Sequence, residues 1–309
     1  MQTIYGDLRI IDSHVHFFSA TFFTAFVQQR GRGLPVHDRQ ALLETLGWEI
    51  PPEDPVALAA RWVAEMDRYG IDRMVLLTSL VGDEASVATA VQAFPERFIG
   101  YIRVDPHQPD MPDRVEYALG TLGLRGIKGF PAMECFHAYD EIVYPLYELA
   151  AAYQVPVLWH FGLLQSAIGA HLKLPSQADA RYSNPMDLQK AARDFPTVPF
   201  IIPHFGAGYF GETLLAAAHC PNIFIDTSSA NGWIRYLPYP LDLQGVFART
   251  LQAVGPERII FGTDSSWFPR GFRADVLETQ LQILAALQVP REAVELIMGG
   301  NMARILRLE

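Results

Sequence analysis

Short apolar segments rich in β-forming residues recur eight times along the 309-residue chain. They occupy residues 8–14, 74–80, 98–104, 126–130, 155–161, 199–205, 223–229 and 259–265. Most are almost continuously apolar rather than alternating, which is typical of parallel strands covered by helices. The pattern therefore predicts a parallel sheet, and it restricts the fold more than any other feature of the sequence.

Helix-compatible segments separate these predicted strands. They are residues 56–69, 83–93, 111–121, 140–153, 185–194, 211–219 and 241–254, and residues 272–288 and 291–307 close the chain. Strand–helix alternation repeated eight times predicts a (β/α)8 TIM barrel that forms a single domain over residues 1–309. The structural alternative is an open doubly wound sheet, but no GxGxxG phosphate turn follows the first predicted strand.

A long insertion separates the first predicted strand from its helix. It spans residues 17–55 and is rich in aromatic residues, namely Phe17, Phe18, Phe22, Phe23, Phe26 and Trp48. In a barrel this segment lies on the face where the strands end, which is the face that carries active sites. Two interpretations stay open: a packed excursion that caps the barrel mouth, or a lid that supplies aromatic walls to a substrate pocket.

Composition narrows the class of partner. Half of the residues are hydrophobic, 19% are charged, and the formal net charge is −10 without any Lys/Arg-rich stretch. These values argue against nucleic acid or an anionic membrane as the main partner. Cys135 and Cys220 show no disulfide spacing, and no signal peptide or transmembrane run is recognisable. We therefore expect a cytoplasmic protein that acts on a small molecule, either as a monomer or as a homo-oligomer.

Polar side chains of metal-ligand type stand at the ends of four predicted strands. His14 and His16 are two residues apart, so in a strand they point to the same face, and His160, His204 and Asp264 follow later strands. The carboxyl ends of barrel strands meet on one face, so these five side chains should converge. Neutral imidazole and carboxylate suit Zn²⁺ or a similar divalent ion. Each residue could instead be an ordinary hydrogen-bonded group at a strand end.

The same residues resemble a known family. HxH after strand one, His after strands five and six, and Asp after strand eight are similar to the amidohydrolase superfamily. Further motifs match its amidohydrolase-related (amidohydrolase 2) branch: Gly126-Ile127-Lys128, Tyr144 to Ala150 (YPLYELA), Val155 to His160 (VPVLWH), Phe261 to Asp264 (FGTD) and Gly300 to Leu306 (GNMARIL). The resemblance covers nearly the whole chain, and it does not specify one substrate.

The resemblance implies both a cofactor and a division of roles. His14, His16, His160 and Asp264 would hold one divalent metal ion, for which we expect Zn²⁺, with Mn²⁺ as the alternative and no second metal. His204 would touch the nascent hydroxide or the substrate, and Asp264 could orient the water or accept its proton. An imidazole near such a site can exchange protons at neutral pH. The catalytic residues expected on this basis are His204 and Asp264.

Three further residues are predicted to bind substrate. Trp267 and Arg270 follow Asp264, and an aromatic wall with a guanidinium fits a flat, carboxylate-bearing molecule. Lys128 has three readings: a carboxylated bridge between two metals, a free ammonium facing an anionic substrate, or a structural partner of a barrel carboxylate. Asp226 ends the seventh strand and could serve the pocket or only the fold.

The predicted function is a metal-dependent hydrolase that cleaves an ester, lactone or amide bond. The alternative is a non-oxidative decarboxylase of an aromatic or vinylogous acid, since the branch that the chain resembles contains decarboxylases, a lactonase and hydratases. A non-catalytic barrel is a third alternative, which the complete ligand set disfavours.

Overall fold

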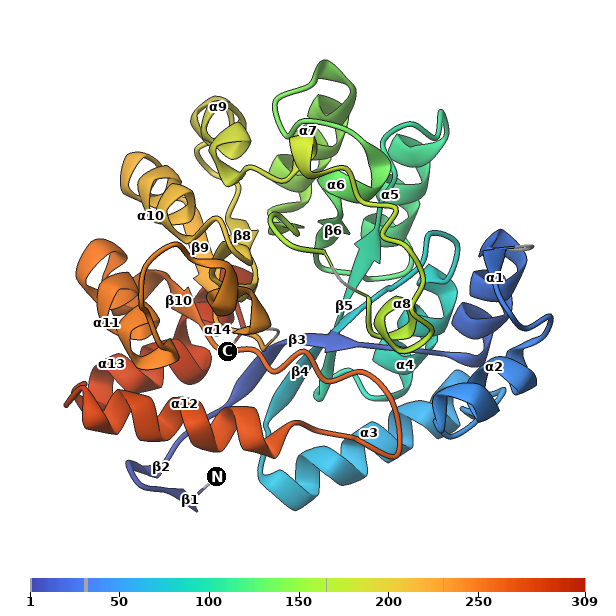
Figure 1. The fold of residues 1–309 in the computed structure, drawn as a ribbon, viewed down its shortest axis with the longest axis horizontal. Coiled ribbons are helices and arrows are strands. Elements are labelled where there is room, and N and C mark those ends of the chain that lie inside the picture. The colour runs from blue at the N-terminus through green and yellow to red at the C-terminus, as the bar shows by residue number, and fades with distance from the viewer. Residues whose placement is uncertain (1, 31–32, 165, 230, 309) are drawn as a thin grey trace.

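A barrel of parallel strands forms the centre of the computed structural model, which describes residues 2–30, 33–164, 166–229 and 231–308 (Figure 1). Within the described residues the strands are β3 (Ile11–His16), β4 (Arg73–Leu77), β5 (Phe98–Arg103), β6 (Ile127–Gly129), β7 (Val157–Trp159), β8 (Phe200–Ile202), β9 (Ile223–Asp226) and β10 (Ile259–Ile260). Each strand pairs in parallel with the next one along the chain. This order confirms the predicted (β/α)8 architecture.

The barrel closes where β3 meets the segment that follows β10. Val15 forms a parallel bridge with Ser265. The main-chain nitrogens of Ser13 and His16 donate to the carbonyls of Phe261 (3.0 Å) and Ser265 (2.8 Å), and that of Asp264 donates to the carbonyl of His14 (2.9 Å). We call this junction the seam. Because it joins the first strand to the last, the open-sheet alternative is excluded.

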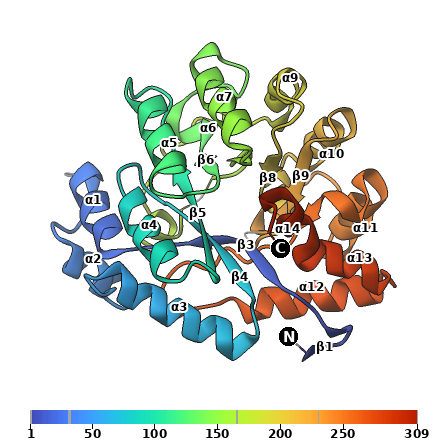
Figure 2. The same cartoon turned by 180° about the vertical axis from the view of Figure 1, so that it is seen from behind.

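Helices connect successive strands and cover the outside of the barrel (Figures 1 and 2). In chain order they are α3 (Pro55–Tyr69), α4 (Glu84–Ala93), α5 (Met111–Gly120), α7 (Tyr144–Tyr153), α9 (Leu188–Asp194), α10 (Phe210–His219), α11 (Leu243–Val254) and α12 (Ala274–Ala286). The sequence sets the ends of α3 clearly: the Asp54 carboxylate accepts from Val56 N, Pro55 begins the helix, and Gly70 ends it in a left-handed conformation (φ 65°). Leu58, Ala59, Trp62 and Met66 form its buried face.

The C-terminal helices close the end of the barrel at which the strands begin. α13 (Arg291–Glu295) and a π-helical turn (Leu296–Gly300) lead into α14 (Asn301–Leu306), which lies across the strands in the reversed view of Figure 2. The Asn301 amide donates to the carbonyls of Pro256 (2.7 Å) and Ile259 (2.8 Å), at the start of β10. Met302, Ile305 and Leu306 join the apolar cluster inside the barrel, whose strand members are Ile11, Val75, Leu77, Ile99, Tyr101, Leu158, Ile201 and Ile260. The opposite end, where the strands finish, is therefore the end left for a site.

The insertion after β3 folds as two helices with an apolar cluster of their own. α1 (Ala20–Arg30) and α2 (Arg39–Leu46) lie beyond the end of β3, and residues 31–32 of the predicted insertion fall outside the described residues. The cluster contains Phe22, Phe23, Phe26, Val27, Leu34, Leu42, Leu43 and Leu46, together with Leu80 and with Ile168 of α8 (Ala167–His171). The insertion is thus packed on the barrel rather than extended from it.

Three smaller findings complete the fold. A hairpin of β1 (Gln2–Thr3) and β2 (Gly6–Asp7) precedes the barrel, and the sequence pattern did not predict it. The first barrel strand covers residues 11–16 rather than 8–14, so both histidines of the HxH motif lie within it. Among the described helices, none has the length and apolar character that crossing a membrane requires.

Candidate metal centre and its cavity

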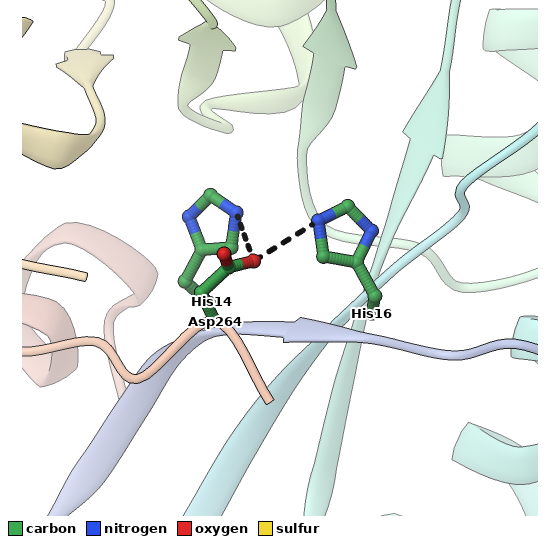
Figure 3. Close-up of side chains that lie close together, drawn as sticks. All are labelled: His14, His16 and Asp264. Atoms are coloured by element: carbon green, nitrogen blue, oxygen red, sulfur yellow. Dashed lines mark ion pairs between the residues drawn. The ribbon is translucent and has the colours of Figure 1, made fainter. Parts of the chain in front are cut away.

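His14 and His16 of β3 meet Asp264 across the seam. Their side chains leave the same face of the strand, with ring centroids 5.4 Å apart. The Oδ1 atom of Asp264 lies 3.9 Å from His14 Nε2 and 3.4 Å from His16 Nε2 (Figure 3). The ligand atoms of the three residues all lie within 4.8 Å of one another. This group, which we call the ligand cluster, could hold one metal ion.

The outer nitrogens of both imidazoles are fixed by hydrogen bonds. His14 Nδ1 donates to Asp226 Oδ2 at 2.7 Å, and His16 Nδ1 lies 2.6 Å from Ser79 Oγ. A proton held on Nδ1 leaves the Nε2 lone pair facing Asp264, which is the usual arrangement of a metal-ligating histidine. His14 Nε2 is buried and has no hydrogen-bond partner among the described residues. A buried lone pair without a partner is costly, and a metal ion would satisfy it. The residues present therefore fit the implied ion.

Unusual backbone conformations set the direction of side chains at the site. Asp264 adopts a left-handed conformation (φ 61°), as do His204 (φ 56°) and Phe205 (φ 54°). Such conformations are rare for residues other than glycine and concentrate at functional sites. Space beside the cluster is also restricted, because a Cβ on Gly262 would lie 2.8 Å from Asp226 Oδ1 and 3.0 Å from His14 Cβ.

The protonation states of the ligand cluster favour the binding of a cation. Burial lowers the pKa of His14 well below its ordinary value, and burial together with the Lys128 ammonium lowers the pKa of His16 to about 4. Burial alone would raise the pKa of Asp264, but its close contact with His16 and the nearby imidazoles bring it below the usual range. Neutral imidazoles beside an ionised carboxylate need not release protons before they bind a metal.

His160 and His204 lie on the same side of the barrel as the ligand cluster. The His204 ring centroid is 5.0 Å from that of His14 and 4.9 Å from that of His160. His204 Nδ1 donates to the main-chain carbonyl of Ser228 (3.2 Å) and lies 2.9 Å from its hydroxyl, which leaves Nε2 free to exchange a proton. His160 Nε2 lies 3.3 Å from the carbonyl of Leu163. The structure thus brings all five predicted strand-end residues together, although His160 stands outside the cluster of three.

Lys128 is fully buried beside the cluster. Its Nζ lies 3.4 Å from His16 Nε2 and 4.8 Å from the centroid of the Phe130 ring. Burial lowers its pKa to about 7. Among the described residues the cavity lining includes Phe130 but not Lys128, so this amine lies beneath the cavity rather than on its wall.

A cavity of about 670 Å³ opens above the ligand cluster. His16, His160, His204 and Asp264 line its floor. Phe18, Phe22 and Phe26 from the insertion form an apolar wall, and Arg103, Arg235 and Arg270 supply positive charge elsewhere on the lining. Aromatic residues of the insertion thus line the cavity, which agrees with the lid interpretation.

Trp267 and Arg270 form one unit at the cavity wall. The central carbon of the guanidinium lies over the indole, 3.5 Å from the ring centroid. Arg270 Nη2 donates to the carbonyl of Asp264 (3.0 Å) and to Ser266 Oγ (2.6 Å), but no carboxylate pairs with Arg270 among the described residues. Trp267 also stacks on Trp48 of the insertion, with centroids 4.1 Å apart. An anionic ligand would supply the negative partner that this guanidinium lacks.

Sequence reasoning did not single out two residues that support the site. Ser79 follows β4 and bonds His16, and Arg103 ends β5 and donates to the Ser79 carbonyl at 2.7 Å. Each is a polar residue at the end of an apolar strand, the same signal that identified the histidines. Asp226, for which two interpretations were open, proves to be the partner of His14.

Comparison with known proteins gives a consistent result. Residues 11–308 match the family model described as Amidohydrolase. No curated protein sequence matches the chain.

Three solved structures illustrate the structural similarity. A 5-carboxyvanillate decarboxylase from Novosphingobium aromaticivorans, complexed with manganese and 4-hydroxy-3-methoxy-5-nitrobenzoic acid, has a TM-score of 0.66 at 16% identity, over 97% of this chain and 96% of that one. A probable 2-pyrone-4,6-dicarboxylic acid hydrolase from Acinetobacter baumannii with bound citric acid scores 0.62 at 12% identity, over 97% and 100%. An amidohydrolase from Burkholderia multivorans with bound zinc scores 0.63 at 17% identity, over 97% and 100%. At these identities the similarity establishes a shared fold.

Proposed function

The chain belongs to the amidohydrolase family, and we propose that it is a metal-dependent hydrolase that cleaves an ester, lactone or amide bond of a small, carboxylate-bearing substrate. The observation that carries the proposal is the ligand cluster of His14, His16 and Asp264, which opens on a cavity lined by His204. We expect His160 to complete the ligand set. Zn²⁺ is the expected ion, Mn²⁺ is the alternative, and a second metal is not expected.

Each cavity residue has a separate task in this proposal. A divalent ion in the cluster would supply a Lewis acid that polarises the substrate oxygen and lowers the pKa of water. His204 accepts the proton of the attacking water and returns one to the leaving group, because its Nδ1 is committed to Ser228 and its Nε2 is free. Asp264, which is ionised, orients that water.

The substrate is held by the cavity wall. Arg270 binds its carboxylate, and Trp267 contacts its body through the edge of the indole, because Arg270 and Trp48 cover the faces of that ring. Lys128 adds positive charge from beneath the floor. The insertion of residues 17–55 acts as the lid, since Phe18, Phe22 and Phe26 reach the lining. We further propose that the enzyme works in the cytoplasm on small molecules, not on nucleic acid or membrane, and that it can assemble as a homo-oligomer.

The second candidate is a non-oxidative decarboxylase of an aromatic or vinylogous acid. The Arg270 guanidinium favours it, since it has no carboxylate partner among the described residues and a carboxylate-anchored substrate needs such a cation, and a decarboxylase is among the structural neighbours. In this reaction the bond between the carboxylate and the aromatic or vinylic carbon of the substrate breaks. His204 then delivers to that carbon the proton that replaces CO2.

Product analysis separates the two reactions. Zinc-loaded and manganese-loaded protein is incubated with an aryl lactone, an aryl ester, an anilide and a set of hydroxybenzoic acids. Hydrolysis releases an acid without CO2. Decarboxylation releases CO2 and places a hydrogen on the ring carbon that carried the carboxylate, and in D2O this hydrogen is deuterium. Hydrolysis of a carboxylate-bearing ester or lactone supports the main proposal. Failure of the protein to bind either metal would contradict both.

A further inference from the structure

The two histidines of β3 are held by groups of different chemistry. His14 has a carboxylate, Asp226, whereas His16 has the hydroxyl of Ser79. Ser79 Oγ lies 3.3 Å from the Leu77 carbonyl and donates its proton there. It is therefore an acceptor toward His16 Nδ1, and it keeps the Nε2 lone pair of that imidazole directed at Asp264.

The main chain of Ser79 is itself fixed by a buried guanidinium. Arg103 Nη1 donates to the Ser79 carbonyl at 2.7 Å, and only 6% of Arg103 is exposed. Its Nη2 pairs with Glu134, the last residue of α6 (Pro131–Glu134), and lies 3.1 Å from Met133 Sδ. A continuous series of hydrogen bonds thus leads from His16 through Ser79 and Arg103 to Glu134.

This ion pair is poorly optimised for its own stability. Arg103 Nε and Glu134 Oε2 are both buried without a hydrogen-bond partner among the described residues. Burying a guanidinium and a carboxylate is unfavourable, and their mutual attraction compensates for it only when the remaining polar atoms are also satisfied. The bond that Arg103 does make well is the one to Ser79. Its burial is therefore explained better by a task at the ligand cluster than by packing.

We propose that Ser79 and Arg103 are positioning residues for metal binding: Ser79 fixes the tautomer and ring orientation of His16, and Arg103 fixes Ser79. The inference rests on the proposed function only in taking His16 as a metal ligand. Loss of the Ser79 hydroxyl frees the His16 ring to rotate or to move its proton to Nε2, where it blocks ligation. Removal of such outer partners typically lowers metal affinity by about 10- to 100-fold.

The first experiment measures Zn²⁺ affinity by competition with a chromophoric chelator. Ser79→Ala should bind Zn²⁺ at least about tenfold more weakly than the natural protein. Thr and Val have nearly the same shape, so Ser79→Thr should retain affinity and Ser79→Val should lose it. Ser86→Ala is the matched control, because Ser86 is equally buried but its hydroxyl bonds Asp83. Equal affinities for the Thr and Val variants would overturn the assignment of Ser79, even if the Ala variant proved unstable.

A second experiment tests the link to Arg103. Arg103→Lys keeps the positive charge but loses the geometry of the guanidinium, so it should weaken Zn²⁺ binding in the natural background. In the Ser79→Ala background, Arg103→Lys should weaken Zn²⁺ binding little further, because both changes act through the hydrogen bond between the Ser79 hydroxyl and His16. Additive effects would show that Arg103 acts independently of Ser79 and would overturn its assignment.

Cobalt substitution supplies a readout that is separate from activity. The visible absorption of bound Co²⁺ should shift in Ser79→Val and stay unchanged in Ser86→Ala, since only the former alters a ligand. If the natural protein binds neither Zn²⁺ nor Co²⁺, the proposed function fails. If it binds both and the Ser79 variants match it, only the present inference fails.

Discussion

Asp226 is the residue on which the orientation of His14 depends. Its carboxylate is fully buried and lies 2.7 Å from His14 Nδ1, and Gly262 packs so closely on both residues that a Cβ there would clash with them. Carboxylate–histidine–metal arrangements of this kind are common because they fix the tautomer and raise the basicity of the ligand.

We predict that Asp226→Asn weakens Zn²⁺ binding by about 10- to 100-fold while the fold is kept. The amide retains the shape of the carboxylate but can offer a proton to His14, which favours the wrong tautomer. Chelator competition measures the affinity, and circular dichroism checks the fold. Asp187→Asn is the control, because Asp187 bonds His137 Nδ1 at 2.6 Å outside the cavity. Equal Zn²⁺ affinity in the two variants would refute the role given to Asp226.

His160 and His204 should separate into a ligand and a proton carrier. His160→Ala is expected to lose bound metal together with activity. His204→Ala should keep a full equivalent of metal and lose about 10²- to 10⁴-fold in turnover, the usual contribution of general acid–base catalysis. Metal content by mass spectrometry and turnover of the best substrate test both. If His204→Ala also loses metal, the division of roles is wrong.

At the scale of elements, the insertion is joined to the last barrel loop by aromatic stacking. Trp48 and Trp267 stack with an interplanar angle of 9°, and the Glu49 main chain donates to the Phe268 carbonyl at 2.9 Å. Trp48→Ala should cost about 0.5–1.5 kcal/mol beyond the lost burial, because it removes this pair. Limited proteolysis should then cut residues 17–55 faster, whereas Trp48→Phe, which keeps a ring, should resist. Identical cleavage rates would show that the stack does not hold the insertion.

A buried carboxylate links the insertion to α4. Asp83 accepts from Ser19 Oγ (2.7 Å) and Ser86 Oγ (2.5 Å), and burial raises its pKa to about 6. A raised folded-state pKa means that the folded protein holds this proton more tightly than the unfolded chain. The stability from this group is therefore present below about pH 4 and is lost as the pH rises through 6.

Asp83→Asn removes this pH dependence. The unfolding free energy of the variant relative to the natural protein should increase between pH 4 and pH 7, by up to about 3 kcal/mol. Urea unfolding of both proteins at the two pH values measures the difference, and groups common to both cancel. A difference that stays constant with pH would contradict the raised pKa.

Strand periodicity and barrel topology made much of the site predictable. His14 and His16 share a face because successive side chains alternate, and Asp264 joins them because all eight strands end on one side. The bond from Ser79 to His16 joins residues 63 positions apart and depends on rotamers, which no local pattern encodes. Three interpretations of Lys128 stayed open, because the depth of its side chain below the barrel mouth depends on packing around Phe130, which no local pattern encodes. The short hairpin of β1 and β2 likewise lacks an apolar signature.

At the scale of the whole molecule, the ligand cluster spans the seam. His14 and His16 belong to the first barrel strand, and Asp264 follows the last. An ion bound by all three would therefore link the two edges of the sheet.

Saturating Zn²⁺ should stabilise the protein as a whole by about 4 kcal/mol at a free concentration 1,000 times the Kd, because an unfolded chain lacks the assembled cluster. Thermal unfolding with and without a chelator measures the shift. Hydrogen exchange should show added protection at the amides of Ser13, His16 and Asp264, which form the seam. Protection confined to the insertion would indicate that the ion binds elsewhere.

The positions of the seam residues in the sequence also determine when each of them is synthesised. A ribosome makes the paired histidines early, but their carboxylate partner is synthesised only with the eighth strand. Zinc in the cell can meet those imidazoles on the nascent polypeptide, yet the complete set of ligands exists only when translation is almost finished. An ion held by this cluster would thus be loaded at a late step of maturation, and a product truncated ahead of that strand would lack both the closed barrel and the complete cluster.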